Sequence, residues 1–211
     1  MIIYSPAKIN IGLKVTGLRP DGYHNLQSVM VPTGLCDIIE IRPTGRPKSG
    51  IIFSQSGIPL ETDSGENLCV LAYKKLAGQT HLPQVEVHLH KQIPVGAGLG
   101  GGSSNAGNIL KGLNSLAADP VNGRLLHDLS AELGSDCPFF LYNQAMMMEG
   151  RGEILNPINI QLHRMYLVLL FPGIYISTPE AYAGIQPDNS GPHLEELIKE
   201  PADMWLSLIH I

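Results

Sequence analysis

The chain has 211 residues, of which 44% are hydrophobic and 16% charged, so it can bury a core large enough for one or two domains. Its formal net charge of -5 provides no basic surface for nucleic acid. The three cysteines form no Cys-x-x-Cys pair, which argues against a disulfide framework or a zinc site and favours a reducing cytoplasm. The N-terminus lacks a signal-peptide pattern, and the longest clean apolar run, 165–171, is too short to cross a membrane.

Strands and helices are both expected along the chain. Alternating or short apolar runs predict strands at 9–15, 27–31, 38–41, 51–53, 85–89, 145–149 and 165–171, with a turn at 19–22. Cap residues and apolar spacing predict helices at 67–78, about 104–116 and about 122–133, and a further helix beginning near Thr178. Helices inserted between strands, with no internal repeat, predict an α+β fold.

The segment before the expected helix at 104–116 is rich in glycine. It reads Pro94, Val95, Gly96, Ala97, Gly98, Leu99, Gly100, Gly101, Gly102, Ser103 and Ser104. Glycine at this density adds nothing to a core, but it lets the backbone approach another group closely. The following helix, expected to start at Ser103 or Ser104, presents free N–H groups and a positive dipole end. This combination indicates a phosphate-binding loop.

Two common phosphate loops do not fit this segment. A Walker A loop needs a lysine where the chain has Gly102. Gly96, Gly98 and Gly101 match the letters of the dinucleotide fingerprint, but no second strand leads into Asp119, where its acidic residue is required. The sequence therefore argues against both a P-loop NTPase and a dehydrogenase.

The loop pattern Pro-x-x-x-Gly-Leu-Gly-x-x-Ser-Ser-x-Ala resembles the ATP loop of the GHMP kinases, which hold the triphosphate with main-chain amides. The resemblance implies a kinase of small molecules that uses ATP and Mg²⁺. It also implies the GHMP kinase fold, in which an N-terminal domain like ribosomal protein S5 domain 2 would cover 1–160. An incomplete C-terminal domain would then cover 161–211.

The start of the chain resembles one branch of this family. The residues are Ser5-Pro6-Ala7-Lys8-Ile9-Asn10 and Asp21-Gly22-Tyr23-His24. That branch phosphorylates a cytidine diphosphate-linked methylerythritol at its 2-hydroxyl, in non-mevalonate isoprenoid synthesis. By periodicity alone, Lys8 and Asn10 fit a solvated strand face. The resemblance instead gives Lys8 a catalytic role and gives Asn10, Tyr23 and His24 roles in substrate binding, with the last two at the cytosine.

A third match with the family surrounds Asp136, in Leu133-Gly134-Ser135-Asp136-Cys137-Pro138. The residue could simply cap a helix, but the resemblance makes it the catalytic base, paired with Lys8. Thr178 resembles a family threonine beside this pair. Tyr182 resembles an aromatic residue that stacks on cytosine, although helix packing remains an alternative reading.

Other features carry less functional weight. His88 and His90 alternate on one strand and fit an exposed face better than a metal pair, and Met146, Met147 and Met148 fit core packing. The family's third glycine-rich motif is missing after Gly191, so the chain is expected to be truncated, which leaves its own activity open. Alternative functions are another GHMP kinase, such as a homoserine kinase, or an inactive nucleotide-binding module.

Overall fold

The computed structural model describes residues 1–46, 49–60, 66–160, 162, 165–170, 180–181, 184–188, 193–200 and 205. The chain forms two compact units, one of residues 1–9 and 32–143 and the other of residues 10–31 and 144–211. Two long strands, β1 (Ile2–Leu18) and β2 (His24–Pro43), contribute residues to both units. The predicted division of the chain near residue 160 stays a prediction.

The first unit contains a sheet in the order β3-β4-β2, with β1 paired to β2. Strand β3 (Ile51–Gly57) runs parallel to β4 (Val85–Lys91), and β4 runs antiparallel to residues 38–43 of β2. The alternation predicted for β4 is confirmed, since Val85, Val87 and Leu89 are all buried. These side chains belong to the main hydrophobic core, which also takes in Ile39 and Ile41 of β2.

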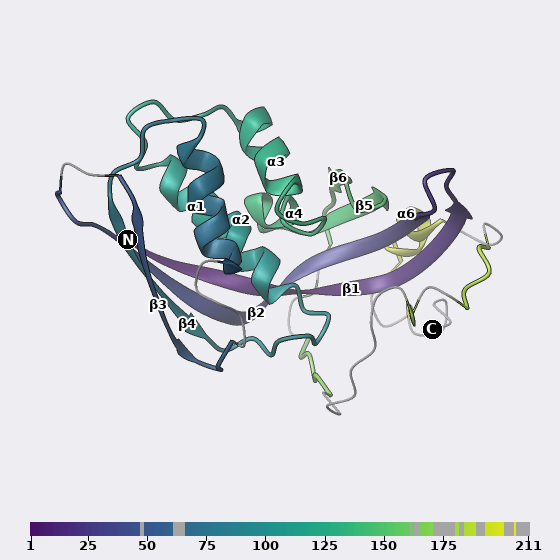
Figure 1. Ribbon diagram of the computed structural model, residues 1–211. Helices are drawn as coiled ribbons and strands as arrows, with labels where there is room; N and C mark the ends of the chain where they lie inside the picture. Colours follow the sequence, from purple (N-terminus) through teal and green to yellow (C-terminus); the bar gives the residue numbers. More distant parts are fainter. Residues whose placement is uncertain are drawn as a thin grey trace. The chain divides into compact units, whose positions relative to one another are not determined.

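Helices supply the other half of that core. They are α1 (Leu68–Ala77), α2 (Gly101–Asn114), α3 (Gly123–Ala131) and α4 (Phe139–Tyr142). Figure 1 shows α1 and α2 side by side over one face of the β3–β4 strands. The predicted start of α1 is confirmed, because the Asn67 side chain accepts a hydrogen bond from the Cys69 amide at 2.9 Å. The last helical residue is followed by Gly78, as expected.

The second unit is built around residues 26–30 of β2, which pair antiparallel with β5 (Met146–Gly150). Strand β5 in turn pairs with β6 (Ile154–Pro157). At the start of the short helix α6 (Leu194–Leu197), the Leu194 amide donates a hydrogen bond to the Gln27 side chain. The core role predicted for Met146, Met147 and Met148 is confirmed, since their exposed fractions are 2%, 4% and 5%.

The strand predicted at 9–15 is longer in the structure, where β1 spans Ile2–Leu18, and three further predictions also differ. The strands expected at 27–31 and 38–41 are one strand, β2, and α2 begins at Gly101 rather than at Ser104. The strand expected at 165–171 is wrong over 165–170, where the chain is exposed and has no regular structure. Phe171 and the helix start expected at Thr178 lie outside the described residues. Among the residues that the structure describes, no helix is long and apolar enough to span a membrane.

Candidate active site

The glycine loop leads directly into the N-terminus of α2. Gly100 is the N-cap residue and has no side chain to cap the helix. The first intrahelical hydrogen bond is donated by the Ser104 amide to the Gly100 carbonyl, at 2.8 Å. The amides of Gly101, Gly102 and Ser103 precede that bond and have no acceptor within the helix, so this helix end suits an anion. Both serines lie in the first turn, and neither caps it.

Glycine is required at two loop positions for different reasons. Gly100 has a φ of 67°, and a Cβ there would lie 3.0 Å from Phe140 Cζ and 3.1 Å from Lys8 Cγ. Gly101 does not have a positive φ, but a Cβ there would lie 2.8 Å from Lys91 Nζ. The Gly101 backbone therefore packs against a buried lysine, a contact that the sequence did not predict.

The structure brings Lys8 and Asp136 together beside this loop. The Lys8 amide donates to the Leu99 carbonyl at 2.9 Å, which fixes the strand against the loop. Lys8 Nζ lies 3.6 Å from Asp136 Oδ2, and the two side chains are 11% and 33% exposed. Burial excludes the solvated-face reading for Lys8, because a lysine at this depth requires a partner.

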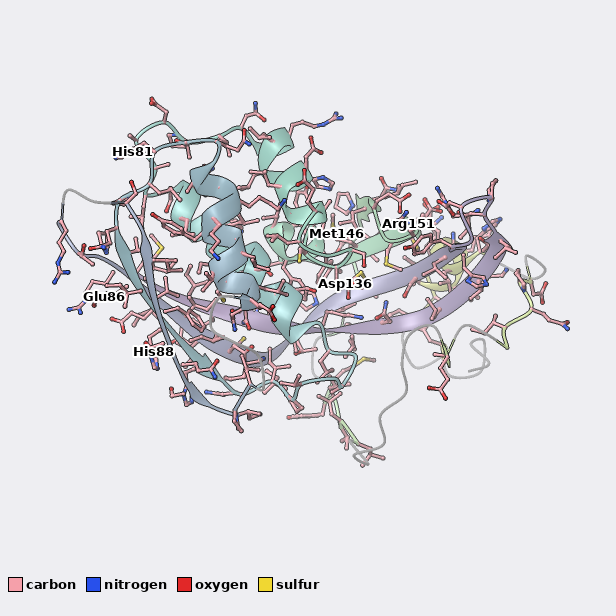
Figure 2. The ribbon with its side chains drawn as sticks, in the orientation of Figure 1. His81, Glu86, His88, Asp136, Met146 and Arg151 are labelled. Carbon is pink, nitrogen blue, oxygen red and sulfur yellow. The ribbon has the colours of Figure 1, made fainter. Side chains whose placement is uncertain are left out.

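Asp136 lies in the turn between α3 and α4 (Figure 2). The N-cap position of α4 is Pro138, and no side chain caps that helix. The helix-cap interpretation of Asp136 is therefore wrong. The carboxylate instead faces the Lys8 ammonium, which is the arrangement that the family resemblance implies.

A buried ion pair lies beneath the loop, and sequence reasoning missed it. Lys91 Nζ lies 2.5 Å from Asp37 Oδ2, and the two side chains are 3% and 0% exposed. Asp37 also accepts hydrogen bonds from the amides of Gln92 and Ile93, at 2.7 and 2.8 Å, and from Asn105 Nδ2 at 2.9 Å. One carboxylate thus ties β2 to the segment before the loop and to the N-terminal part of α2. A signal was present, because Lys91 continues the inward-facing series of Val85, Val87 and Leu89.

The residues predicted to bind substrate belong to the second unit. Asn10 donates from Nδ2 to Ser28 Oγ at 2.8 Å, and Ser28 Oγ donates to the Gly12 carbonyl at 2.7 Å. Tyr23 is 56% exposed, and the guanidinium carbon of Arg151 lies 4.1 Å from the centroid of its ring. His24 begins β2 and is half-buried. Thr178 and Tyr182 lie outside the described residues.

Asp21 fixes the turn that carries Tyr23. Its Oδ1 accepts a hydrogen bond from the Tyr23 amide at 3.1 Å, and Arg19 Nε donates to both carboxylate oxygens. Desolvation pushes the pKa of Asp21 upward, but the Tyr23 amide and the charges of Arg19 and Arg151 outweigh it and hold this pKa below its usual value. Asp21 therefore stays ionised at neutral pH.

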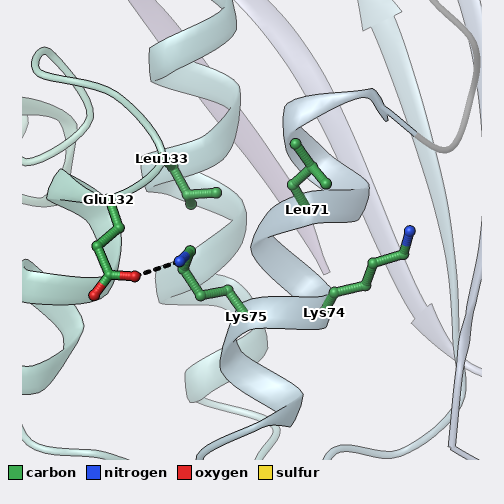
Figure 3. A pocket seen from close by; sticks show the side chains of 5 residues that line it. All are labelled: Leu71, Lys74, Lys75, Glu132 and Leu133. Atoms are coloured by element: carbon green, nitrogen blue, oxygen red, sulfur yellow. Dashed lines mark hydrogen bonds and ion pairs between the residues drawn. The ribbon is translucent and has the colours of Figure 1, made fainter.

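Two other features do not join the site. A surface depression of about 390 Å³ lies between α1 and α3, where an ion pair between Lys75 and Glu132 closes one side (Figure 3). None of its lining residues belongs to the glycine loop. His88 and His90 bond through ring nitrogens to Ser54 and Ser56 on β3. Within the described part of the chain, no group of three or more His, Cys, Asp or Glu residues could hold a metal ion.

Comparison with known proteins agrees with this geometry. Residues 67–144 match the family model described as the GHMP kinases N terminal domain. A protein of Bacteroides fragilis (strain YCH46), named 4-diphosphocytidyl-2-C-methyl-D-erythritol kinase, is 40% identical over 205 residues, 97% of this chain and 75% of that protein. A protein of the same name from Azobacteroides pseudotrichonymphae is 41% identical over 206 residues, 97% of this chain and 76% of that protein.

Solved structures give the same result. The crystal structure of a 4-(cytidine 5'-diphospho)-2C-methyl-D-erythritol kinase has a TM-score of 0.76 and 34% identity, covering 94% of this chain and 70% of that one. A mevalonate kinase of Methanococcus jannaschii has a TM-score of 0.53 and 16% identity over 75% of this chain and 56% of that one, and it shows the fold alone.

The α+β fold, the glycine loop and these matches define the class: this is a GHMP kinase fold. Within the class, the chain belongs to the 4-diphosphocytidyl-2-C-methyl-D-erythritol kinase family. The predictions of a kinase and of the GHMP fold are therefore confirmed. The chain spans about three quarters of the length of these relatives.

Proposed function

We propose that this protein transfers the γ-phosphoryl group of ATP to the 2-hydroxyl of 4-diphosphocytidyl-2-C-methyl-D-erythritol. The observation that carries the proposal is the contact between the Lys8–Asp136 pair and the N-cap of α2. A Cβ on Gly100 would lie 3.1 Å from Lys8 Cγ, so the ion pair is adjacent to the uncapped helix end that suits a triphosphate. A proton acceptor beside a phosphate cradle is what phosphoryl transfer to an alcohol requires.

The loop and the ion pair take separate roles. Amides between Gly96 and Ser104 hold the triphosphate, and the positive end of the α2 dipole favours its charge. Asp136 accepts the proton of the attacking hydroxyl, and Lys8 polarises that hydroxyl and balances the carboxylate charge. At 3.6 Å the two groups form an ion pair without a direct hydrogen bond between Nζ and Oδ2, so a substrate hydroxyl can bond to both.

The second unit takes the role of substrate recognition. Tyr23 offers an exposed aromatic face on which a pyrimidine can stack, and His24 follows it at the start of β2 with ring nitrogens that can bond to a base edge. Asn10 bonds to Ser28 and presents its amide from β1. Thr178 is proposed to adjoin the catalytic pair and Tyr182 to provide a second stacking face, on family resemblance alone.

Magnesium fits the proposed reaction as a partner of the triphosphate. Magnesium in phosphoryl-transfer sites is held mostly by phosphate oxygens and water, with few protein ligands. Bound there, the ion would neutralise charge on the transferring phosphoryl group. The three free cysteines support a reducing cytoplasm as its compartment.

A transfer assay tests the function. The protein is incubated with Mg·ATP and either the cytidylyl substrate, its uridylyl analogue or homoserine, and ADP and phosphorylated product are quantified. We expect product from the cytidylyl substrate and little from the other two. Homoserine phosphate would favour the alternative kinase, and ATP binding without any ADP would favour an inactive binding module.

Kinetics of variants test the recognition residues. Replacing Tyr23 and Tyr182 together by alanine should raise the KM for the cytidylyl substrate about tenfold or more per lost stack, with the KM for ATP nearly unchanged. A wild-type KM in this double variant would mean that both aromatics serve packing.

A further inference from the structure

Two turns of the second unit are joined by two ion pairs. The first turn joins β1 to β2 and carries Arg19 and Asp21, while the second joins β5 to β6 and carries Arg151 and Glu153. Arg19 Nη1 lies 3.9 Å from Glu153 Oε1, and Arg151 Nη1 lies 3.9 Å from Asp21 Oδ2. Each turn therefore contributes one cation and one anion, and each cation pairs with the opposite turn.

The ring of Tyr23 lies within this charge pattern. Its amide donates to Asp21 and its carbonyl accepts from the Arg19 amide at 2.7 Å, so the backbone of the residue is fixed from both sides. The Arg151 guanidinium carbon stands 4.1 Å from the ring centroid, which covers one face of the ring (Figure 2 labels Arg151). Tyr23 is nevertheless 56% exposed, so much of its surface stays accessible to a ligand.

The ion pairs alone do not explain the presence of Arg151. Its side chain is 45% exposed, and surface pairs at 3.9 Å contribute little to stability. A cation over an aromatic face adds a directional attraction, and it restricts the ring to one orientation before any ligand arrives. Restricting a binding side chain in advance lowers the entropy lost on binding.

We propose that Arg151 is a positioning residue for nucleobase recognition. It holds the Tyr23 ring by one face so that the other face stacks on the cytosine of the cytidylyl substrate. This inference rests on the proposed function, since it requires that Tyr23 binds the base. The turn between β5 and β6 would then contribute to substrate selection through its contact with Tyr23.

The test measures CMP affinity by titration calorimetry in wild type, Arg151→Gln, Tyr23→Ala and the double variant. We expect Arg151→Gln to weaken CMP binding about three- to tenfold, in the range of a cation–π contact at a partly exposed site. In the Tyr23→Ala background the same change should have no further effect, and ATP affinity should be unchanged in every variant. Arg124→Gln is the matched control, because Arg124 is an exposed arginine paired with Asp128 on α3.

The outcomes separate this inference from the proposed function. If Tyr23→Ala leaves CMP affinity unchanged, the base role of Tyr23 is wrong, and the role of Arg151 is overturned with it. If Tyr23→Ala weakens binding but Arg151→Gln does not, only the inference about Arg151 is overturned. An equal loss in both backgrounds would show that Arg151 contacts the ligand directly, which also overturns a positioning role. A fall in ATP affinity together with CMP affinity would show a purely structural effect and would contradict the proposal.

Discussion

Replacing Lys91 by methionine should destabilise the protein strongly, because it leaves the Asp37 carboxylate without a cation. The two side chains are 3% and 0% exposed, so solvent cannot replace the lost ammonium. Breaking one partner of a buried ion pair costs about 3–5 kcal/mol. At about 2–4 °C per kcal/mol for a chain of this size, the melting temperature should fall by roughly 6–20 °C.

The same substitution offers a control and a rescue. Lys75→Met removes the exposed pair with Glu132 and should cost less than about 1 kcal/mol. Asp37→Asn combined with Lys91→Met removes both charges, while the asparagine Oδ1 can still accept from the amides of Gln92 and Ile93. The loss in free energy of unfolding in the double variant should therefore be about 1–3 kcal/mol smaller than the sum of the losses in the two single variants.

Thermal unfolding followed by circular dichroism, together with ATP titration, measures both effects. Because Lys91 Nζ lies against Gly101, ATP affinity should fall in Lys91→Met while CMP affinity is retained. A Lys91→Met protein within 1 kcal/mol of wild type would refute the buried-pair reasoning. Strictly additive single changes would also refute it, because they would show that the two groups do not depend on each other.

Three further predictions concern the first unit. Asp136→Asn should lower kcat by about 10²–10⁴ with ATP affinity within twofold of wild type, and full turnover would exclude a base role. Gly100→Ala should lower both the melting temperature and kcat/KM more than Gly98→Ala does. Both glycines have positive φ, but only at Gly100 would a Cβ meet close neighbours. Equal effects in the two variants would refute this steric argument. Burial raises the pKa of the Cys137 thiol to about 11 and also raises the pKa of the half-buried Cys36 thiol. Iodoacetamide at pH 8 should therefore label Cys36 slowly and Cys137 only when the protein unfolds. Peptide mass spectrometry of the labelled protein checks this.

Local patterns predicted the elements whose ends and faces depend on adjacent residues. The inward series of β4 follows from alternation, and the start of α1 at Asn67 follows from its side chain bonding two residues ahead. The start of α3 was found in the same way, since Asn122 accepts from the Leu125 amide. In each case the cause lies within one turn or one strand of the residue concerned.

The sequence did not predict features whose cause lies elsewhere in the chain. The apolar runs at 27–31 and 38–41 predicted two strands, yet β2 is continuous through the intervening Pro32 and Gly34. Helix α2 starts at Gly101 because Gly100, whose left-handed backbone packs closely against the distant residues Lys8 and Phe140, begins the helix without a side-chain cap. The apolar run at 165–170 met the rule for a strand, but it is exposed and pairs with no strand in the described structure.

Periodicity alone assigned Lys8 to a solvated strand face, and the structure shows why that assignment was wrong. A strand with lysine and asparagine at alternate positions is normally solvated on that face, and Asn10 is indeed exposed. Lys8 is buried because the glycine loop covers it, through the bond from its amide to Leu99 and the close approach of Gly100. Burying an ammonium without a partner would cost several kcal/mol, so the same packing requires an anion nearby, and Asp136 provides it. The loop that is proposed to hold the triphosphate therefore also creates the need for the ion pair that is proposed to act on it.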